Sequence, residues 1–388
     1  MPQTKLKVGF MVDDIDRKAM GTALYMQKFI ELIARDYQDT IELVLISREG
    51  KGTHPVCSLA RHIEIPTVKL PKFSGVFSFM RWFFKNTEQF DVVHYPRPKL
   101  YPFFWKLKTK KTVVTFHDAP EKGSPRFRTA ANYFWEWSVK LWFHRYVDAA
   151  IGVSQFSADG IADYYHIPHH KTYAVYNGGS EGYAPFGEQE RANGQARLAS
   201  QYKIRSPYVL QVSRLVPHKN AHRQIEAFGI LKKKYNLPHS LVIMGGGSSH
   251  DPLYEQMVRR AVEQSGYADD IIVAPYIETS DLNMLYACSA VTLMAPTSEG
   301  FGIPLVEAMA SGAPIVTSNR SSLPEIVGDA GTLVDPFNPE SISEGVAAVV
   351  RDQEKTADMV RRGLSRAKQY TWSASAQETV KLYQSLFF

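Results

Sequence analysis

The sequence contains only two cysteines among its 388 residues, Cys57 and Cys288. They lie far apart and lack the paired spacing of a zinc site or a redox motif, so we expect neither metal ions nor disulfides to organise the fold. No apolar run approaches the roughly 20 residues that span a bilayer. The first residues also lack the apolar segment and the cleavage site of a signal peptide. These absences favour a cytoplasmic protein over a secreted or integral membrane protein.

Acidic residues are missing between Asp91 and Asp118, in a chain whose formal net charge is +6. This stretch instead carries six basic side chains, Arg97, Lys99, Lys106, Lys108, Lys110 and Lys111, interleaved with the aromatic rings of Tyr101, Phe103, Phe104 and Trp105. A solvated basic loop over partly buried aromatic rings is the preferred interpretation. Peripheral contact of the Lys99–Lys111 segment with anionic lipid at the inner face of the membrane is the alternative.

The chain is too long for one ordinary hydrophobic core, which predicts two domains. Its composition, 44% hydrophobic and 22% charged, is that of an ordered globular protein. In both halves, short apolar runs alternate with amphipathic helical segments, a pattern typical of parallel sheets covered by helices. We therefore predict an α/β fold with two Rossmann-like, doubly wound domains. Ligands of such sheets bind at the carboxyl ends of the strands, so we expect the domains to face an interdomain cleft.

The domain boundaries follow from a change in composition. After residue 180 the sequence becomes polar and loses its β-branched residues, which predicts a linker. We assign residues 1–183 to an N-terminal domain, 184–206 to the linker and 207–371 to a C-terminal domain.

The most informative motif is PTSEGFGIPLVEAMASGAPIV, at residues 296–316. Gly300 and Gly302 permit close approach of the backbone to a ligand, and Pro304 suits the first turn of a helix whose N–H groups attract an anion such as a diphosphate. Glu299 precedes this helix and Glu307 lies about one turn inside it, so the two carboxylates can reach different hydroxyls of one ligand. The alternative is a helix start with a glycine turn and two solvated glutamates.

This motif is very similar to the E-x7-E segment of the retaining GT-B glycosyltransferases of family 4, also called group 1. The resemblance implies that Glu299 contacts hydroxyls of the donor sugar and that Glu307 contacts the nucleotide ribose. It places Gly300, Phe301, Gly302 and Ile303 at the donor site. It also implies that no bound divalent metal is needed, and that a terminal helix at residues 373–388 packs back on the first domain.

A second motif, VSRLVPHKN at residues 212–220, follows the first strand of the second half. Arg214 offers a planar fork and Lys219 a mobile point charge, a pair suited to a leaving diphosphate whose charge grows as the glycosidic bond breaks. A surface salt bridge is the alternative. The R-x4-K spacing resembles the family's phosphate-binding pair, which implies an electrophilic catalytic role for both residues.

Several weaker candidates lie at other strand ends. His117 follows a buried strand in VVTFHDAP and resembles the family's sugar-proximal histidine, although a satisfied structural histidine is the common alternative. Gly21 and Thr22 open a helix whose N–H groups can face phosphate, but the family's Gly-Gly pair is absent here. Further donor-site candidates by resemblance come from a glycine turn and from a loop near the base: Gly245, Gly246, Tyr276 and Ile277. Asp13, Asp14 and Asp16 fit an acceptor-side or solvated role better than a metal site.

The resemblance implies a glycosyltransferase that transfers a hexose, with retention, from a UDP- or GDP-sugar to a saccharide or lipid-linked saccharide, in bacterial polysaccharide biosynthesis. The nucleotide-sugar is a substrate, so no cofactor is expected, and nucleic acid is not an expected partner. The alternatives are a sugar-nucleotide epimerase or phosphorylase on the same fold, and a non-catalytic carbohydrate- or nucleotide-binding module. A dinucleotide-dependent oxidoreductase is disfavoured because neither first strand is followed by G-x-G-x-x-G.

Overall fold

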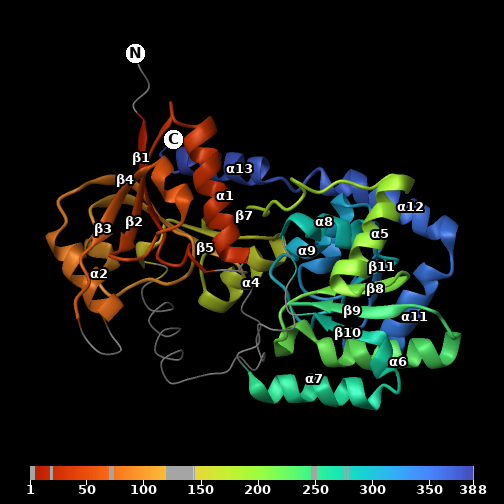
Figure 1. The fold of residues 1–388 in the computed structure, drawn as a ribbon. Helices are drawn as coiled ribbons and strands as arrows, with labels where there is room; N and C mark the ends of the chain where they lie inside the picture. Colours follow the sequence, from red (N-terminus) through yellow and green to blue (C-terminus); the bar gives the residue numbers. More distant parts are fainter. Residues whose placement is uncertain are drawn as a thin grey trace. The chain divides into compact units, whose positions relative to one another are not determined.

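The computed structural model describes residues 5–17, 21–69, 74–118, 143, 145–245, 251–274, 277 and 279–387. The chain forms two compact units (Figure 1). Unit 1 comprises Met1–Asn177 together with Trp372–Phe388, and unit 2 comprises Gly178–Thr371. Each unit contains one parallel sheet with helices, so the predicted α/β class with two doubly wound sheets is confirmed.

The sheet of unit 1 has seven parallel strands in the order β3-β2-β1-β4-β5-β6-β7. The strands are β1 Leu6–Met11, β2 Ile41–Arg48, β3 Arg61–Ile65, β4 Phe90–Tyr95, β5 Thr109–Phe116, β6 Ala149–Gly152 and β7 Thr172–Ala174. The order of the strands reverses between β1 and β4. This is the point at which doubly wound sheets bind ligands.

The described helices of unit 1 are α1 Gly21–Asp36, α2 Ser74–Lys85, α4 Gln155–Tyr165 and α13 Trp372–Ser385, with short 3-10 turns η1 Pro55–Leu59, η2 Phe104–Lys106 and η3 His169–Lys171. Helix α13 packs beside α1 (Figure 1). A terminal helix therefore returns to the first unit.

Aromatic side chains from the basic segment complete the core of unit 1. Tyr101 is buried and stacks on Phe79 of α2, with ring centroids 4.1 Å apart. Phe104 is also buried, and Trp105 stacks on Tyr146 at 4.9 Å. This packing explains why aromatic and basic residues alternate there: Tyr101 and Phe104 fill the core, while Lys106, Lys108 and Lys110 are exposed.

The sheet of unit 2 has six parallel strands in the order β10-β9-β8-β11-β12-β13. The strands are β8 Tyr208–Val212, β9 Ser240–Met244, β10 Ile271–Ala274, β11 Val291–Met294, β12 Ile315–Ser318 and β13 Thr332–Val334. The described helices and turns are α5 Glu188–Tyr202, η4 Pro217–Lys219, α6 Ala221–Tyr235, α7 Pro252–Gln264, η5 Ala268–Asp270, α8 Thr279–Ala287, α9 Ile303–Ala310, α10 Leu323–Val327, α11 Pro339–Val350 and α12 Gln353–Ala367. The strand order here reverses between β8 and β11.

The predicted linker at 184–206 is largely helical instead. Helix α5 occupies most of it and belongs to unit 2. An added Cβ at Gly194 would lie 3.1 Å from Met284 Cγ of α8 and 2.9 Å from Cys288 Sγ directly after it, and Arg197 donates to Asp281 of α8 at 2.7 Å. Only Gly194 and Leu198 of α5 are buried, so its polar composition reflects a solvent-facing helix rather than a linker.

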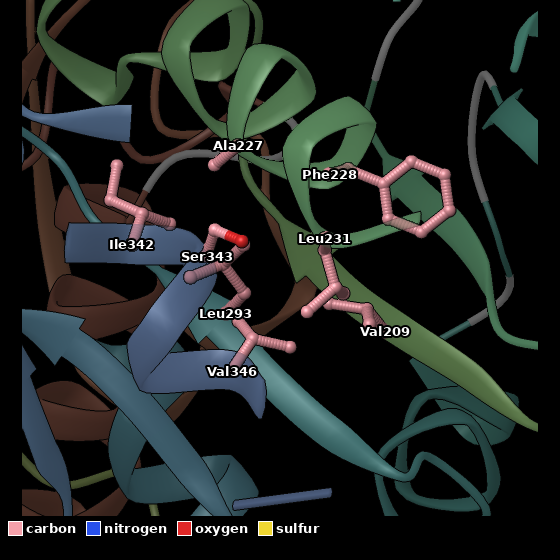
Figure 2. A pocket seen from close by; sticks show the side chains of 8 residues that line it. All are labelled: Val209, Ala227, Phe228, Leu231, Leu293, Ile342, Ser343 and Val346. Carbon is pink, nitrogen blue, oxygen red and sulfur yellow. The ribbon is translucent and has the colours of Figure 1, made fainter. Parts of the chain in front are cut away.

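A small gap remains in the core of unit 2, between α6 and α11 above β8 and β11 (Figure 2). Its lining is apolar except for Ser343. The buried Ser343 hydroxyl has no hydrogen-bond partner among the described residues. The gap is a packing defect far too small for a nucleotide or a sugar.

Candidate active site

Two loops of unit 2 are joined where its strand order reverses. They follow β8 and β11, which are neighbours in the sheet. Asn220 lies in the loop after β8 and is buried. Its Nδ2 donates to the carbonyl oxygens of Ala295 at 3.0 Å and Pro336 at 2.6 Å. The backbone N–H of Thr297 donates to the carbonyl of His218 at 2.8 Å. These hydrogen bonds hold the two loops together at the edge of the sheet where doubly wound folds bind ligands.

Lys219 and Glu299 form an ion pair between the two loops. Their side chains are 16% and 15% exposed, so the pair is better shielded from water than a surface salt bridge. The backbone of Glu299 is held on both sides: its N–H donates to Ser321 Oγ at 3.0 Å, and its carbonyl accepts from Ser322 Oγ at 2.9 Å. Two predicted catalytic side chains are therefore placed together.

Arg214 lies in the same loop as Lys219, directly after β8. It is half-buried and forms no ion pair with any residue in the described part of the chain. A guanidinium without a carboxylate partner keeps its charge and its fork of donors for an anionic ligand. The loop therefore contains Lys219, which is paired with Glu299, and Arg214, which forms no ion pair with a described residue.

Helix α9 begins at Ile303, directly after a glycine in a left-handed conformation. Gly302 has φ of 98°, and an added Cβ would lie 2.8 Å from Leu323 Cδ2. Phe301 is buried and packs edge-on against Tyr370 at 5.6 Å, and Gly300 is buried as well. The N-terminal end of α9, which carries the partial positive charge of the helix dipole, therefore directly follows the loop that contains Glu299.

Glu307 is buried one turn into α9. Tyr286 of α8 donates its hydroxyl to Glu307 Oε2 at 3.0 Å, and Tyr183 also donates to this carboxyl group. Burial raises the pKa of Glu307 to about 7, although both hydroxyls act in the opposite direction. The alternative of a solvated glutamate at this position is therefore wrong. No sequence motif marks Tyr183 or Tyr286, so neither residue could be predicted from local sequence.

The glycine turn after β9 is described only at Gly245. Its φ is 95°, and an added Cβ would lie 2.7 Å from the carbonyl oxygen of Ser213, so only glycine fits beside the Arg214 loop. Ile277 is buried after β10. Gly246 and Tyr276 lie outside the described residues.

His117 lies at the end of β5 in unit 1. Its Nε2 is 2.9 Å from the carbonyl of Pro96, which can only accept, so Nε2 carries the proton and Nδ1 is left as an acceptor. Its ring meets Tyr25 edge-on at 5.0 Å, and burial lowers the pKa of the imidazole to about 4. His117 is therefore neutral at pH 7. Gly21 and Thr22 form the first turn of α1, as predicted for a helix start.

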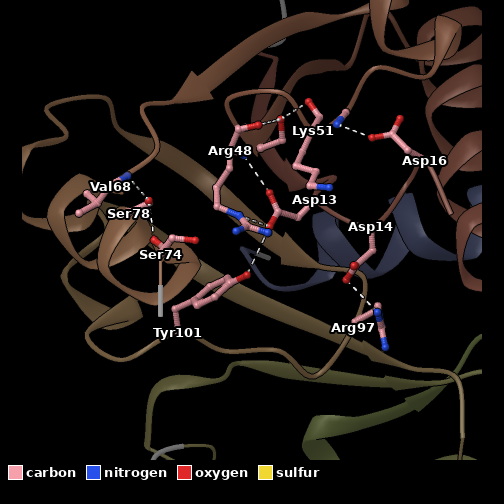
Figure 3. Close-up of polar contacts among 12 residues, drawn as sticks. Asp13, Asp14, Asp16, Arg48, Lys51, Val68, Ser74, Ser78, Arg97 and Tyr101 are labelled. Carbon is pink, nitrogen blue, oxygen red and sulfur yellow. Dashed lines mark hydrogen bonds and ion pairs between the residues drawn. The ribbon is translucent and has the colours of Figure 1, made fainter. Parts of the chain in front are cut away.

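The three aspartates after β1 bind to the protein itself (Figure 3). Asp13 accepts from the backbone N–H and the Nε of Arg48 at 2.8 and 2.7 Å. Asp14 pairs with Arg97 at 2.8 Å. Asp16 accepts from the loop of residues 52–54. The first two aspartates gather cations at the edge of the sheet where β1, β2 and β4 end, and the third fixes a neighbouring loop.

Two family models match the chain. A family model described as "Glycosyl transferases group 1" matches residues 197–366, and one described as "Glycosyltransferase Family 4" matches residues 26–179. The chain belongs to the group 1 and family 4 glycosyltransferases. The first model contains both the Arg214 loop and the Glu299–Glu307 motif, so the predicted resemblance is confirmed.

Individual relatives are similar at lower identity. The O-antigen chain mannosyltransferase B of Escherichia coli is 28% identical over 288 residues, which are 73% of each chain. The serotype-specific mannosyltransferase WbdA of E. coli is 24% identical over 267 residues, 69% of this chain but 32% of that protein. The structure of Anabaena HepE in complex with UDP and glucose matches with a TM-score of 0.77 and 17% identity, covering 98% of this chain and 100% of that one. The enzyme therefore has the GT-B fold.

None of the described helices is both long enough and apolar enough to cross a membrane.

Proposed function

We propose that the enzyme transfers a hexose from a UDP- or GDP-sugar to a hydroxyl of a saccharide or lipid-linked saccharide, with retention, in bacterial polysaccharide biosynthesis. The observation that carries the proposal is the Lys219–Glu299 pair at the strand reversal of unit 2, in the same loop as Arg214, which forms no ion pair with a described residue. Two relatives are named mannosyltransferases, and HepE was solved with UDP and glucose. Mannose and glucose are accordingly the first sugars to test.

Each residue has a distinct role in this reaction. Arg214 and Lys219 bind the diphosphate and stabilise the negative charge that it gains as the glycosidic bond breaks. Glu299 accepts hydrogen bonds from the donor sugar, and Glu307 accepts them from the ribose. The Lys219–Glu299 pair keeps both side chains in place in the absence of donor, which reduces the ordering required on binding.

Retention follows from attack on the face that the diphosphate leaves. The acceptor hydroxyl bonds to the anomeric carbon, the bond to the diphosphate oxygen breaks, and that oxygen takes the acceptor proton. His117, neutral and with Nδ1 as an acceptor, serves to orient a sugar hydroxyl rather than to supply positive charge. We propose that no metal ion takes part, so activity is expected to persist in EDTA.

The first experiment is a thermal-shift screen with UDP, GDP, UDP-glucose and GDP-mannose, because a ligand stabilises the state that it binds. Arg214→Ala should weaken nucleotide-diphosphate binding by about 10- to 100-fold, as expected for a charge-assisted hydrogen bond. Arg259→Ala, at an exposed position on α7, is the matched control. Equal affinity in the two variants would show that the clamp is assigned wrongly.

Product analysis separates this proposal from its rivals. Sugar attached to an acceptor, with release of nucleoside diphosphate, is the expected result. Isomerised sugar nucleotide without an acceptor would indicate an epimerase, and a requirement for inorganic phosphate would indicate a phosphorylase. Binding without turnover over a broad acceptor set would favour a non-catalytic module.

Peripheral membrane contact, which a lipid-linked acceptor requires, is also proposed. The buried rings of Tyr101 and Phe104 are not available to lipid, but Phe77 and Phe84 of α2 are 44% and 59% exposed. Phe84 lies against Phe103 with ring centroids 5.4 Å apart. Exposed Arg81 and Lys85 on the same helix provide charge for anionic headgroups.

Co-sedimentation with phosphatidylglycerol vesicles tests this contact. Phe84→Ser should reduce the bound fraction several-fold, whereas Leu253→Ser, at a 77% exposed position on α7, should not. Equal vesicle binding by both variants would show that α2 does not contact the membrane.

A further inference from the structure

Unit 1 has a cluster of four cations at the carboxyl ends of β1, β2 and β4: Arg17, Arg48, Arg97 and Lys99. Two carboxylates, Asp13 and Asp14, lie among them. Arg48 pairs with Asp13 at 2.7 Å and Arg97 pairs with Asp14 at 2.8 Å (Figure 3). Arg17 also pairs with Asp14, at 2.9 Å. The carboxylate of Asp16 accepts two backbone N–H groups and a hydroxyl from residues 52–54, and counting it as well leaves four cations against three carboxylates. The cluster therefore has more positive than negative charge.

Lys99 is the cation without an acid partner. Its ammonium lies 5.4 Å from the ring centroid of Tyr101, and it forms no hydrogen bond or ion pair with any residue in the described ranges. It is partly buried. Burial lowers its pKa, and repulsion by Arg48 and Arg97 adds to this, against the attraction of Asp14 and Asp13. A partly buried ammonium without an acid partner is costly unless a ligand supplies the negative charge.

The cluster also lies where a ligand is expected. The strand order of unit 1 reverses between β1 and β4, and Asp13 and Lys99 follow these two strands. Arg97 retains a 33% exposed side chain, of which only NH1 bonds to Asp14. An oxyanion at this edge would meet the ammonium of Lys99 and the remaining donors of Arg97.

We propose that Arg97 and Lys99 bind a phosphate group of the acceptor, so that the enzyme selects acceptors that carry a phosphate ester or diphosphate. This inference rests on the proposed glycosyltransfer and deepens it by naming a charge on the acceptor. The phosphate belongs to a lipid-linked diphosphate or to a soluble sugar phosphate, and the experiment distinguishes these sources.

Binding is measured with inorganic pyrophosphate by calorimetry, in the presence of saturating nucleoside diphosphate to occupy the Arg214 site. Lys99→Gln should weaken pyrophosphate binding at least five-fold, and Lys99→Arg should retain most of it. Lys5→Gln, at the opposite end of β1, is the matched control. Equal pyrophosphate affinity in the Lys99→Gln and Lys5→Gln variants would overturn the proposal.

A second measurement does not depend on the stability of a variant. In wild-type protein with 13C-methylated lysines, pyrophosphate should shift the Lys99 signal, which is identified by its absence from Lys99→Arg. No shift at saturating nucleotide would also overturn the proposal. Nucleotide binding through Arg214 is read separately in the same samples, so failure of the donor assignment and failure of the phosphate site give different results.

Once turnover is measured, the acceptor source follows from kinetics. With a polyprenyl diphosphate-linked sugar or with a soluble sugar 1-phosphate, Lys99→Gln should raise KM for the phosphorylated acceptor at unchanged KM for the donor. The acceptor that shows this change is the physiological source of the phosphate. An equal change in both KM values would contradict the assignment.

Discussion

The imidazole Nδ1 of His94 on β4 lies 2.5 Å from the hydroxyl of Tyr383 on α13, 289 residues further along the chain. The other ring nitrogen lies 2.7 Å from Thr115 Oγ1 on the neighbouring strand. All three residues are buried. This hydrogen-bonded chain fixes α13 to the sheet of unit 1. Because buried polar groups are costly when unpaired, any other position of α13 that breaks these contacts would be disfavoured.

Acid should weaken unit 1 through this histidine. Burial lowers the pKa of His94 to about 3, with a smaller contribution from His117. Below the ordinary histidine pKa of about 6.5, the unfolded state therefore binds more protons than the folded state. The free energy of unfolding should fall by about 2 kcal/mol between pH 6.5 and 5 on account of His94. His94→Asn should flatten this dependence in urea titrations, whereas His170→Asn, at an exposed position, should leave it unchanged.

Nucleotide affinity should rise between pH 6 and 8 because of Glu307. Its raised pKa of about 7 means that the carboxyl group is partly protonated at neutral pH, and the ionised form is the better acceptor for ribose hydroxyls. The phosphates of the nucleotide titrate in every variant, so the informative quantity is the difference from Glu307→Gln. Calorimetry with UDP or GDP should give a steeper rise for the wild type. Parallel curves would contradict the role of Glu307.

Gly302→Ala should destabilise unit 2 by about 1–3 kcal/mol, because a side chain at this positive φ is strained. The new methyl group would also lie 2.8 Å from Leu323 Cδ2 at the start of α10, so Leu323 or the Gly302 turn that precedes α9 must shift. We expect weaker nucleotide binding together with a lower Tm. Gly187→Ala tests the specificity of the effect, since Gly187 has a negative φ at the start of α5 and space for a methyl group.

Ser343→Ala should leave unit 2 equally stable or more stable by about 1 kcal/mol. The buried hydroxyl has no partner among the described residues and lines an apolar gap, so its removal relieves a desolvation cost of about 1–3 kcal/mol and enlarges the gap only slightly. Chemical denaturation measures the difference. A loss of more than about 1 kcal/mol would show that the hydroxyl is satisfied in solution.

The sequence predicted the parts of the site that depend on local chain geometry. Gly302 and Pro304 specify a turn and a helix start by their own backbone preferences, and Arg214 is placed by the strand that precedes it. The ion pair between Lys219 and Glu299 joins residues 80 positions apart. It depends on β8 and β11 being neighbours, which follows from the order of the strands and not from any local motif.

Burial was harder to predict than position. Helical spacing placed Glu307 one turn into α9, but its environment is set by Tyr183 and Tyr286, which reach it from other segments. The polar composition of α5 indicated a linker because an exposed helix and a loop have similar compositions. Likewise, the composition of the basic segment after β4 did not indicate that Lys110 pairs with Asp91 whereas Lys99 forms no ion pair with any described residue.

The division of the chain into units has a consequence for protein engineering. Because α13 belongs to unit 1, unit 2 is an insertion within the first unit, bounded by the junctions 177/178 and 371/372. A chimera that exchanges donor specificity with another member of the family must therefore be spliced at both junctions. A single crossover near the middle of the chain would pair His94 with a foreign terminal helix. Whether such a hybrid folds would then depend on how well the foreign helix packs on the sheet of unit 1. The transplanted nucleotide site would not be the deciding factor.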